Sequence, residues 1–272
     1  MDKIFYKYRP INDNTLDSIS NNYFYFSQPT QLNDKNDSIS PISLEMTKDT
    51  FLGWISRSGY SAYKDQLLKN INLFSEKSFL DKFENGHKYT NERLRIFCLS
   101  ECWDESEMWG HYADSNNGIC LGYKSYFNHN AYLLKVEKQD NPFIVYDGDK
   151  KVMVLLKIIY NKTEIHSFNL FQGNQEALIE AFRTKEPKWS YEKEYRIVFM
   201  NTSNIDENKK IKYDKRDLVE VIFGLRTPKD KMREIYNIVK NNYDISKISF
   251  YKIKDEIAIE MKRDKITDIN NI

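Results

Sequence analysis

The chain has little glycine, proline and cysteine, and it lacks any long apolar run. Its 272 residues include 9 Gly, 6 Pro and 3 Cys. An odd number of cysteines excludes the dense disulfide framework of small secreted domains and favours a reducing compartment. No segment approaches the roughly 18 apolar residues of a membrane span, and the N-terminus has no apolar leader. We therefore expect a cytoplasmic protein that does not insert into a membrane.

Net charge is also nearly absent. The chain carries 41 Lys and Arg against 40 Asp and Glu, a formal net charge of +1. General binding to duplex phosphates needs a broad positive field, which this balance does not supply, although a local basic cleft stays compatible with it. Aromatic residues are abundant, with 19 Tyr, 16 Phe and 4 Trp, and charged residues make up 30%. Such a composition is typical of a folded protein with a substantial core.

Hydrophobic periodicity predicts strands and helices mixed along the chain. Strand patterns occupy residues 5–10, 23–29, 94–100, 118–124, 131–138, 152–160, 191–200, 211–214 and 218–224. Helical patterns occupy residues 12–22 (capped by Asn14 or Thr15), 106–115, 174–186 and 228–242. A polar stretch with helical spacing predicts a helical insertion near 44–92. We expect one α+β domain over residues 1–272, with a mixed, largely antiparallel sheet and flanking helices.

Residues 98–123 hold the densest set of chemically active residue types. On a helix, Glu107, His111 and Asp114 lie at i, i+4 and i+7, so they share one face. A carboxylate one turn from an imidazole orients the ring and raises its pKa, which suits general acid–base catalysis by His111. The alternative is that His111 is structural and bonds a neighbouring strand while aromatic residues of the helix face the core.

Metal binding is a weaker alternative for the same segment. Cys98 and Cys102 are followed by Cys120, which leaves no second close pair, and His111 has no nearby second histidine. Structural zinc sites normally use two close pairs of ligands. We therefore favour no metal site, and we expect the three cysteines to be core residues.

A second candidate segment is WSYEKEYR at residues 189–196. On a strand, Glu192, Glu194 and Arg196 would share one face. If that face lines a cleft, Arg196 holds one acid and leaves the other free, and paired acids in unequal environments can act as a distinct acid and base. The alternative is a surface ladder of ion pairs.

Four stretches occur in an order that resembles a bacterial family. They are YKYRP with YFSQPTQLND near the N-terminus, FCLSECWDESEMWGHYADSNNGICLGY in the middle, KWSYEKEYRIV later, and VEVIFGLRTP toward the C-terminus. Over residues 4 to about 240 this order resembles the family catalogued as domain of unknown function 2971. The family often carries Asn-Asp-Pro-Phe and an acid in the first loop, whereas this chain has LNDKND at 32–37. The resemblance implies a fold and candidate positions but no activity.

A further resemblance lies in the order of Arg9, Ser100 and Glu192-x-Glu194, which is similar to the arginine, serine, Glu-x-Glu order of ADP-ribosyltransferases. It implies NAD as the cofactor. Arg9 would hold a phosphate or ribose, Ser100 would support the nicotinamide pocket, and Glu194 would offset the positive charge on the ribose as nicotinamide leaves. Read without the resemblance, Arg9 is either a bidentate anion ligand or a surface arginine stacked on tyrosine.

Three functional hypotheses follow from these segments. The first is a bacterial effector that is an NAD-dependent ADP-ribosyltransferase or NAD glycohydrolase, in phage defence or a toxin-type stress response, with Trp109 or Tyr112 stacked on nicotinamide. It requires Arg9, Ser100 and Glu194 to converge. The second is a metal-dependent nuclease or hydrolase built on Glu107, His111, Asp114, Glu192 and Glu194, which requires its carboxylates within about 5 Å of one another. The third is a non-catalytic sensing or binding module without an open pocket.

The first hypothesis makes a small-molecule nucleotide the expected partner and leaves the protein or nucleic-acid target open. We also expect the helix at 106–115 to approach the strand at 191–200, because both are polar, aromatic-rich elements within an ordinary core.

Overall fold

The computed structural model describes residues 2–34, 37, 42–43, 45–75, 92–137, 144–163, 168–169, 171–172, 182–200, 209–255 and 260–268. Over these residues the fold is α+β, with a mostly antiparallel sheet and flanking helices, as the sequence predicts. The expected helix at 174–186 and the end of the insertion near 44–92 lie mostly outside the described residues.

The main sheet closes on itself. In the described part of the chain, the closed circuit consists of β1 (Lys3–Arg9), β4 (Leu94–Ser100), β10 (Glu194–Met200), β8 (Lys150–Lys157), β6 (Ala131–Lys135) and β5 (Ile119–Asn128). Each pair in this circuit is antiparallel, and β5 returns to pair with β1. Closure gives each of these strands a neighbour on both sides, although β1 and β4 share only one residue pair.

Further strands extend the sheet from β5. They are β12 (Leu218–Phe223), then β13 (Ser249–Ile253), which runs parallel to β12, and β14 (Arg263–Lys265). Strand β7 (Val145–Asp147) also pairs with β8. Two small sheets join β2 (Tyr23–Tyr25) to β11 (Lys210–Lys212) and β3 (Ile42–Ser43) to β9 (Phe168–Asn169).

The main core combines aliphatic and aromatic side chains. Phe24 stacks on Phe97 and Tyr213 with ring centroids 4.4 and 4.6 Å apart. Helices α1 (Asp13–Ser20) and α7 (Lys229–Asn242) pack against each other and bury Ile19 and Ile235 in the same core. Part of the high aromatic content of the sequence therefore fills this core.

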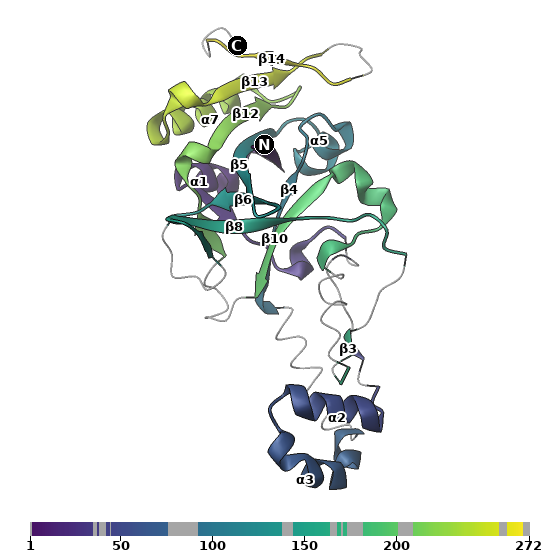
Figure 1. The fold of residues 1–272 in the computed structure, drawn as a ribbon. Helices are drawn as coiled ribbons and strands as arrows, with labels where there is room; N and C mark the ends of the chain where they lie inside the picture. The colour runs from purple at the N-terminus through teal and green to yellow at the C-terminus, as the bar shows by residue number, and fades with distance from the viewer. Residues whose placement is uncertain are drawn as a thin grey trace.

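Helices α2 (Lys48–Arg57) and α3 (Lys64–Lys69) lie together at one end of the molecule, away from the closed sheet (Figure 1). Phe51, Ile55 and Phe171 form a small core of their own there. These helices agree with the predicted helical insertion over the part of 44–92 that is described. No described helix has the length and apolar character needed to cross a membrane.

Two predicted helix ends are wrong. The cap of α1 is Asn12, whose side chain accepts from the backbone N–H of Thr15, because an Asn just before the first turn can reach that donor. Helix α5 (Ser106–Tyr112) stops before Asp114, which has a φ of 48°. Asp114 therefore does not continue the helical face of Glu107 and His111.

Gly118 follows α5 and is required by a close approach. A Cβ at this position would lie 2.3 Å from the carbonyl oxygen of Arg9 and 2.8 Å from that of Ala113. The left-handed backbone after α5 belongs to Asp114, Ser115 and Asn116. Gly118 is therefore not the left-handed residue that ends α5, and the fold requires it for its small size.

We expect Gly118→Ala to lower the free energy of unfolding by about 1–3 kcal/mol, because its Cβ would overlap backbone atoms that cannot rotate away. The control is Gly110→Ala, since a Cβ at 110 has open space around it and lies inside a helix. That change should be neutral or stabilising by up to about 1 kcal/mol. Urea denaturation measures both, and equal stability of the two variants would contradict the close approach.

Candidate functional site

A cavity opens where β1 and β4 separate. These two strands share a single residue pair, Tyr6 with Ser100, although each is fully paired on its other side. Beyond that pair, the Nζ of Lys7 donates a 2.8 Å hydrogen bond to the carbonyl oxygen of Cys98. The cavity at this opening has a volume of about 240 Å³. It is lined by Tyr6, Lys7, Tyr8, Ser27, Gln31, Leu32, Asn33, Asp37, Cys98, Leu99, Ser100, Met108, Tyr112, Lys185, Glu192 and Glu194.

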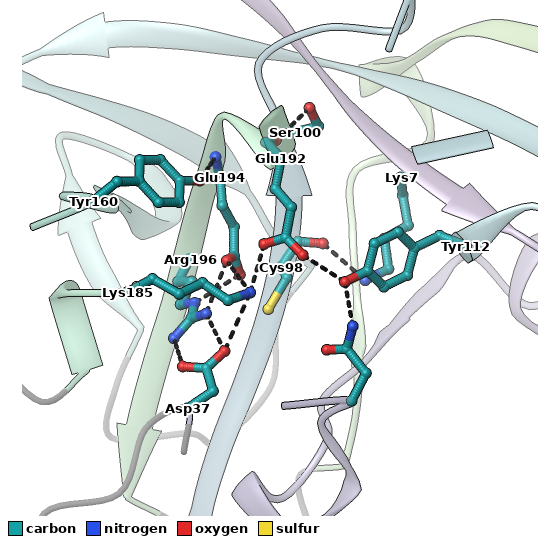
Figure 2. A network of polar contacts seen from close by, with 11 residues as sticks. Lys7, Asp37, Cys98, Ser100, Tyr112, Tyr160, Lys185, Glu192, Glu194 and Arg196 are labelled. Carbon is teal, nitrogen blue, oxygen red and sulfur yellow. Dashed lines mark hydrogen bonds and ion pairs between the residues drawn. The ribbon is translucent and has the colours of Figure 1, made fainter. Parts of the chain in front are cut away.

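A buried guanidinium lies behind one wall of the cavity. Arg196 on β10 is 0% exposed. Its Nε and Nη2 donate to the carboxylate of Glu194 at 2.6 and 2.8 Å, and its Nη1 and Nη2 donate to that of Asp37 at 2.7 and 2.5 Å. Glu194 and Arg196 lie on one face of β10 because they are two residues apart, while Asp37 comes from the loop near the N-terminus. Figure 2 shows this double bidentate pairing.

A second buried cation links three acids. The Nζ of Lys185 lies 2.5 Å from Glu192 Oε2, 3.2 Å from Glu194 Oε2 and 3.3 Å from Asp37 Oδ2. All four side chains are almost fully buried. Such a cluster is expensive to desolvate, so its charges must compensate one another.

Tyr112 connects the cluster to α5. Its hydroxyl donates to Glu192 Oε1 at 2.5 Å and accepts from Asn33 Nδ2 at 2.6 Å. Burial, together with the charge of Glu192, raises the pKa of Tyr112 well above its usual range, so this hydroxyl stays a neutral donor. In Figure 2, Glu192 lies between Lys185 and Tyr112.

The two glutamates have opposite electrostatic environments. Burial raises the pKa of Glu192, the neighbouring charge of Glu194 raises it further, and Lys185 and Tyr112 offset these two effects only in part. Burial also opposes ionisation of Glu194, but Arg196 and Lys185 outweigh it and hold the pKa of Glu194 well below its usual range. The cavity therefore presents one permanently ionised carboxylate beside one that can take up a proton.

The position of Glu192 depends on a break before β10. Residues Pro187–Glu192 form a 3-10 helix, and Lys193 is left-handed with a φ of 43°. The predicted strand at 191–200 is therefore wrong at its start, since β10 begins at Glu194. Glu192 therefore does not share a strand face with Glu194. The turn at Lys193 brings the two side chains to the same lysine, Lys185.

The structure brings together four of the residues predicted for the site: Glu192, Glu194, Ser100 and Tyr112 line the cavity. Ser100 acts on the backbone, because its hydroxyl donates to the carbonyl oxygen of Glu192 at 2.8 Å. The contact between Tyr112 and Glu192 confirms that the predicted helix at 106–115 approaches the WSYEKEYR segment. Arg196 is not among the lining residues, but it binds the carboxylate of Glu194, which is.

Three other predicted residues do not line the cavity. Arg9 donates from Nε to the Thr15 hydroxyl at 3.1 Å, so Ser100 and Glu194 converge without it. Trp109 is 0% exposed, packs edge-on against Tyr8 and donates from its indole nitrogen to the backbone, which leaves it no face for a ligand. His111 is exposed, and its ring lies 6.2 Å from that of Tyr191.

Sequence reasoning missed the two residues that complete the ion cluster, Asp37 and Lys185. The family's acidic first loop was the signal for Asp37, since this loop supplies both Asn33 and Asp37 to the site. Lys185 lies in the segment for which the sequence predicts a helix. No sequence pattern distinguishes a single lysine that belongs to a site from one on the surface. Lys7 was not singled out because it sits among ordinary strand residues.

The described part of the chain contains no evident set of metal ligands. Within it, no three His, Cys, Asp or Glu side chains are grouped so that they could hold a metal ion. Glu107 and His111 are exposed on α5, whereas Glu192 and Glu194 are buried against Lys185. The carboxylates that the metal hypothesis combines thus lie in different environments. All three cysteines are free thiols.

Comparison with known proteins finds a family model that matches the central segment. Residues 108–197 match the family model described as protein of unknown function (DUF2971). The predicted family resemblance is confirmed over these residues. They include Tyr112, Lys185, Glu192, Glu194 and Arg196, so most of the ion cluster belongs to the matched segment. No curated protein and no solved structure shows significant similarity to this chain.

We expect Asp37→Asn to lower the free energy of unfolding by about 3–5 kcal/mol, because it leaves part of a buried cationic pair uncompensated. Glu234→Gln is the control, since Glu234 pairs with Lys231 on the exposed surface of α7. Its cost should stay below about 0.5 kcal/mol. Chemical denaturation measures both variants, and a small cost for Asp37→Asn would show that Asp37 does not hold the cluster together.

Proposed function

We propose that this protein cleaves the N-glycosidic bond of a nucleotide, with NAD as the first candidate, as a glycohydrolase or an ADP-ribosyltransferase. The observation that carries the proposal is the pair Glu192 and Glu194 on one cavity wall, with one carboxylate fixed in the ionised state and the other able to exchange a proton. Cleavage of a glycosidic bond builds positive charge on the sugar and requires a base for the incoming nucleophile, so it uses two carboxylates with unequal roles.

In the hydrolytic reaction, the bond between ribose C1′ and the nicotinamide nitrogen breaks, and its electron pair leaves with neutral nicotinamide. The carboxylate of Glu194 offsets the positive charge that develops on the ribose. A water oxygen bonds to C1′, and Glu192 accepts the proton from that water. The same steps with an acceptor hydroxyl in place of water give ADP-ribosyl transfer.

The size of the cavity limits what it can enclose. Sites that enclose a whole drug-sized ligand usually have volumes of roughly 300–1,000 Å³. A cavity of about 240 Å³ suits one end of a dinucleotide, such as nicotinamide with its ribose. The aromatic rings of Tyr6, Tyr8 and Tyr112 on its lining can contact such a ring and sugar. The adenosine part of NAD would then extend outside the cavity, beyond the phosphate attached to this ribose.

The first test is nicotinamide release from NAD, with and without bacterial lysate as a source of acceptors. We expect the native protein to release nicotinamide, and Glu194→Gln to reduce the rate by about 10²-fold or more, because it removes the charge that offsets the developing cation. Glu186→Gln is the matched control, since Glu186 pairs with Lys188 outside the cavity and its loss should leave the rate unchanged.

Thermal unfolding of each variant separates a lost carboxylate from a lost fold. An absence of nicotinamide release by the folded native protein, with protein and nucleic-acid acceptors present, contradicts the proposal. Full activity of a folded Glu194→Gln variant contradicts the role of Glu194.

The proposed base also predicts a pH dependence. Because Glu192 must be ionised to accept a proton and its pKa is raised, the rate should fall as the pH drops through that pKa. Tyr112→Phe removes a hydrogen bond that favours the carboxylate, so the acid limb of kcat/KM should move to higher pH. Tyr146→Phe, an exposed position, should not move it. An acid limb that stays in place in Tyr112→Phe would argue against Glu192 as the base.

A further inference from the structure

We propose that Lys7 is the anion-binding residue of this cavity and that the substrate carries a phosphate which its ammonium group binds. This inference rests on the proposed function for the identity of the rest of the substrate. It adds a specificity: a nucleotide should be accepted and the corresponding nucleoside should not.

Lys7 differs from the other cations of the site in what it contacts. Lys185 and Arg196 are both surrounded by carboxylates. The described hydrogen bond of Lys7 goes to a backbone carbonyl oxygen, that of Cys98, and its Nζ also lies 5.0 Å from the ring centroid of Phe97. An ammonium group has three donors, so this arrangement leaves donors for a ligand.

The position of Lys7 is unfavourable without a ligand. It lies where β1 and β4 separate, and burial lowers its pKa below the usual value. A carbonyl dipole and an aromatic face compensate the charge of Lys7 only in part, although the negative charges of Glu194 and Glu192 also favour its ammonium form. A bound anion would add an opposite charge in direct contact with Lys7, which makes this part of the cavity complementary to a negatively charged group.

Neutral polar residues line the same cavity as Lys7. They are Ser27, Gln31 and Asn33, and the amide of Asn33 donates to the Tyr112 hydroxyl. Phosphate accepts several hydrogen bonds at once, so a single lysine with nearby neutral donors is a suitable set of ligands. The ionised Glu194 belongs to the wall with Arg196, and there it would repel a phosphate and direct it toward Lys7.

Lys7 also takes the role that the residue order predicts for Arg9, which is to contact a phosphate. Both residues lie on β1, two positions apart and therefore on one face of the strand. Arg9 turns to Thr15, whereas Lys7 reaches the cavity. The geometry thus transfers the expected phosphate contact from Arg9 to Lys7.

The test compares ribose 5-phosphate with ribose, which fit the cavity and contain no glycosidic bond to cleave. Isothermal titration calorimetry at low ionic strength, in a buffer free of phosphate and sulfate, gives both affinities. We expect ribose 5-phosphate to bind at least about tenfold more tightly than ribose to the native protein, as a charge-assisted contact provides. In Lys7→Met the two affinities should become nearly equal.

The matched control is Lys124→Met on β5, which removes an exposed lysine and should preserve the difference between the ligands. Equal affinities in the native protein overturn the inference, and so does an unchanged difference in Lys7→Met. If Lys7→Met does not fold, the two ligands are compared on the native protein and on Arg9→Met. The inference then requires that the native protein prefers ribose 5-phosphate and that Arg9→Met keeps this preference.

The result separates this inference from the proposed function. A preference for ribose 5-phosphate that depends on Lys7, without nicotinamide release from NAD, keeps the phosphate site and rejects NAD cleavage. Nicotinamide release without any preference for the phosphate keeps NAD cleavage and rejects the role of Lys7.

Discussion

The burial of Arg196 is the constraint on which the site depends. A guanidinium does not lose its proton in a protein, so a fully buried arginine needs acceptors that compensate its charge. Arg196 obtains them from Glu194 on its own strand and from Asp37 in the first loop. Two acids at one cation then leave negative charge in excess, and Lys185 supplies the second cation. The charge of Arg196 thus holds three parts of the chain together. They are β10, the loop that carries Asp37, and the segment that carries Lys185 just before the 3-10 helix at Pro187–Glu192.

Stability alone is a weak reason for such a cluster. Replacing a buried ion network by apolar side chains of similar volume is often neutral or stabilising, whereas breaking it is costly. The cluster here also borders a cavity, and it holds Glu192 and Glu194 in unequal states. A network that served only to hold the fold would require neither an opening in the sheet nor that inequality. These two features together favour a ligand site.

The strands and most helices followed from the sequence because their patterns are local. Buried strands such as Leu94–Ser100 and Leu218–Phe223 are short apolar runs, and α7 repeats apolar residues at helical spacing. Closure of the sheet did not follow, because it depends on β5 pairing with both β1 and β6, and no local pattern encodes that choice. Helix α5 was predicted too long for a similar reason: the contacts of Gly118 with Arg9 and Ala113 decide where the chain turns.

The candidate site was predictable to the extent that its residues were unusual for their surroundings. Glu192 and Glu194 stood out as acids beside aromatic residues, and both line the cavity. Arg9 matched the order of residue types in ADP-ribosyltransferases, but the order fixes only the strand, and side-chain contacts decide which of its residues reaches the cavity. Lys185 became visible only through the buried acids that it contacts, since the need to compensate a buried charge is a property of the folded molecule.

The separation of β1 from β4 ties these observations together. A closed sheet normally fills its interior and satisfies its backbone, so an opening between two of its strands leaves carbonyl groups without partners. Here Lys7 donates to one of them, that of Cys98, and a strand carbonyl thereby holds an ammonium group at the cavity. The ion cluster, with Glu194 favouring the ionised state, lines the same cavity. A ligand in this cavity therefore meets both a cation with donors to spare and a fixed negative charge. Under the proposed function, the phosphate of the sugar would bind Lys7 and its electron-poor carbon would lie near Glu194.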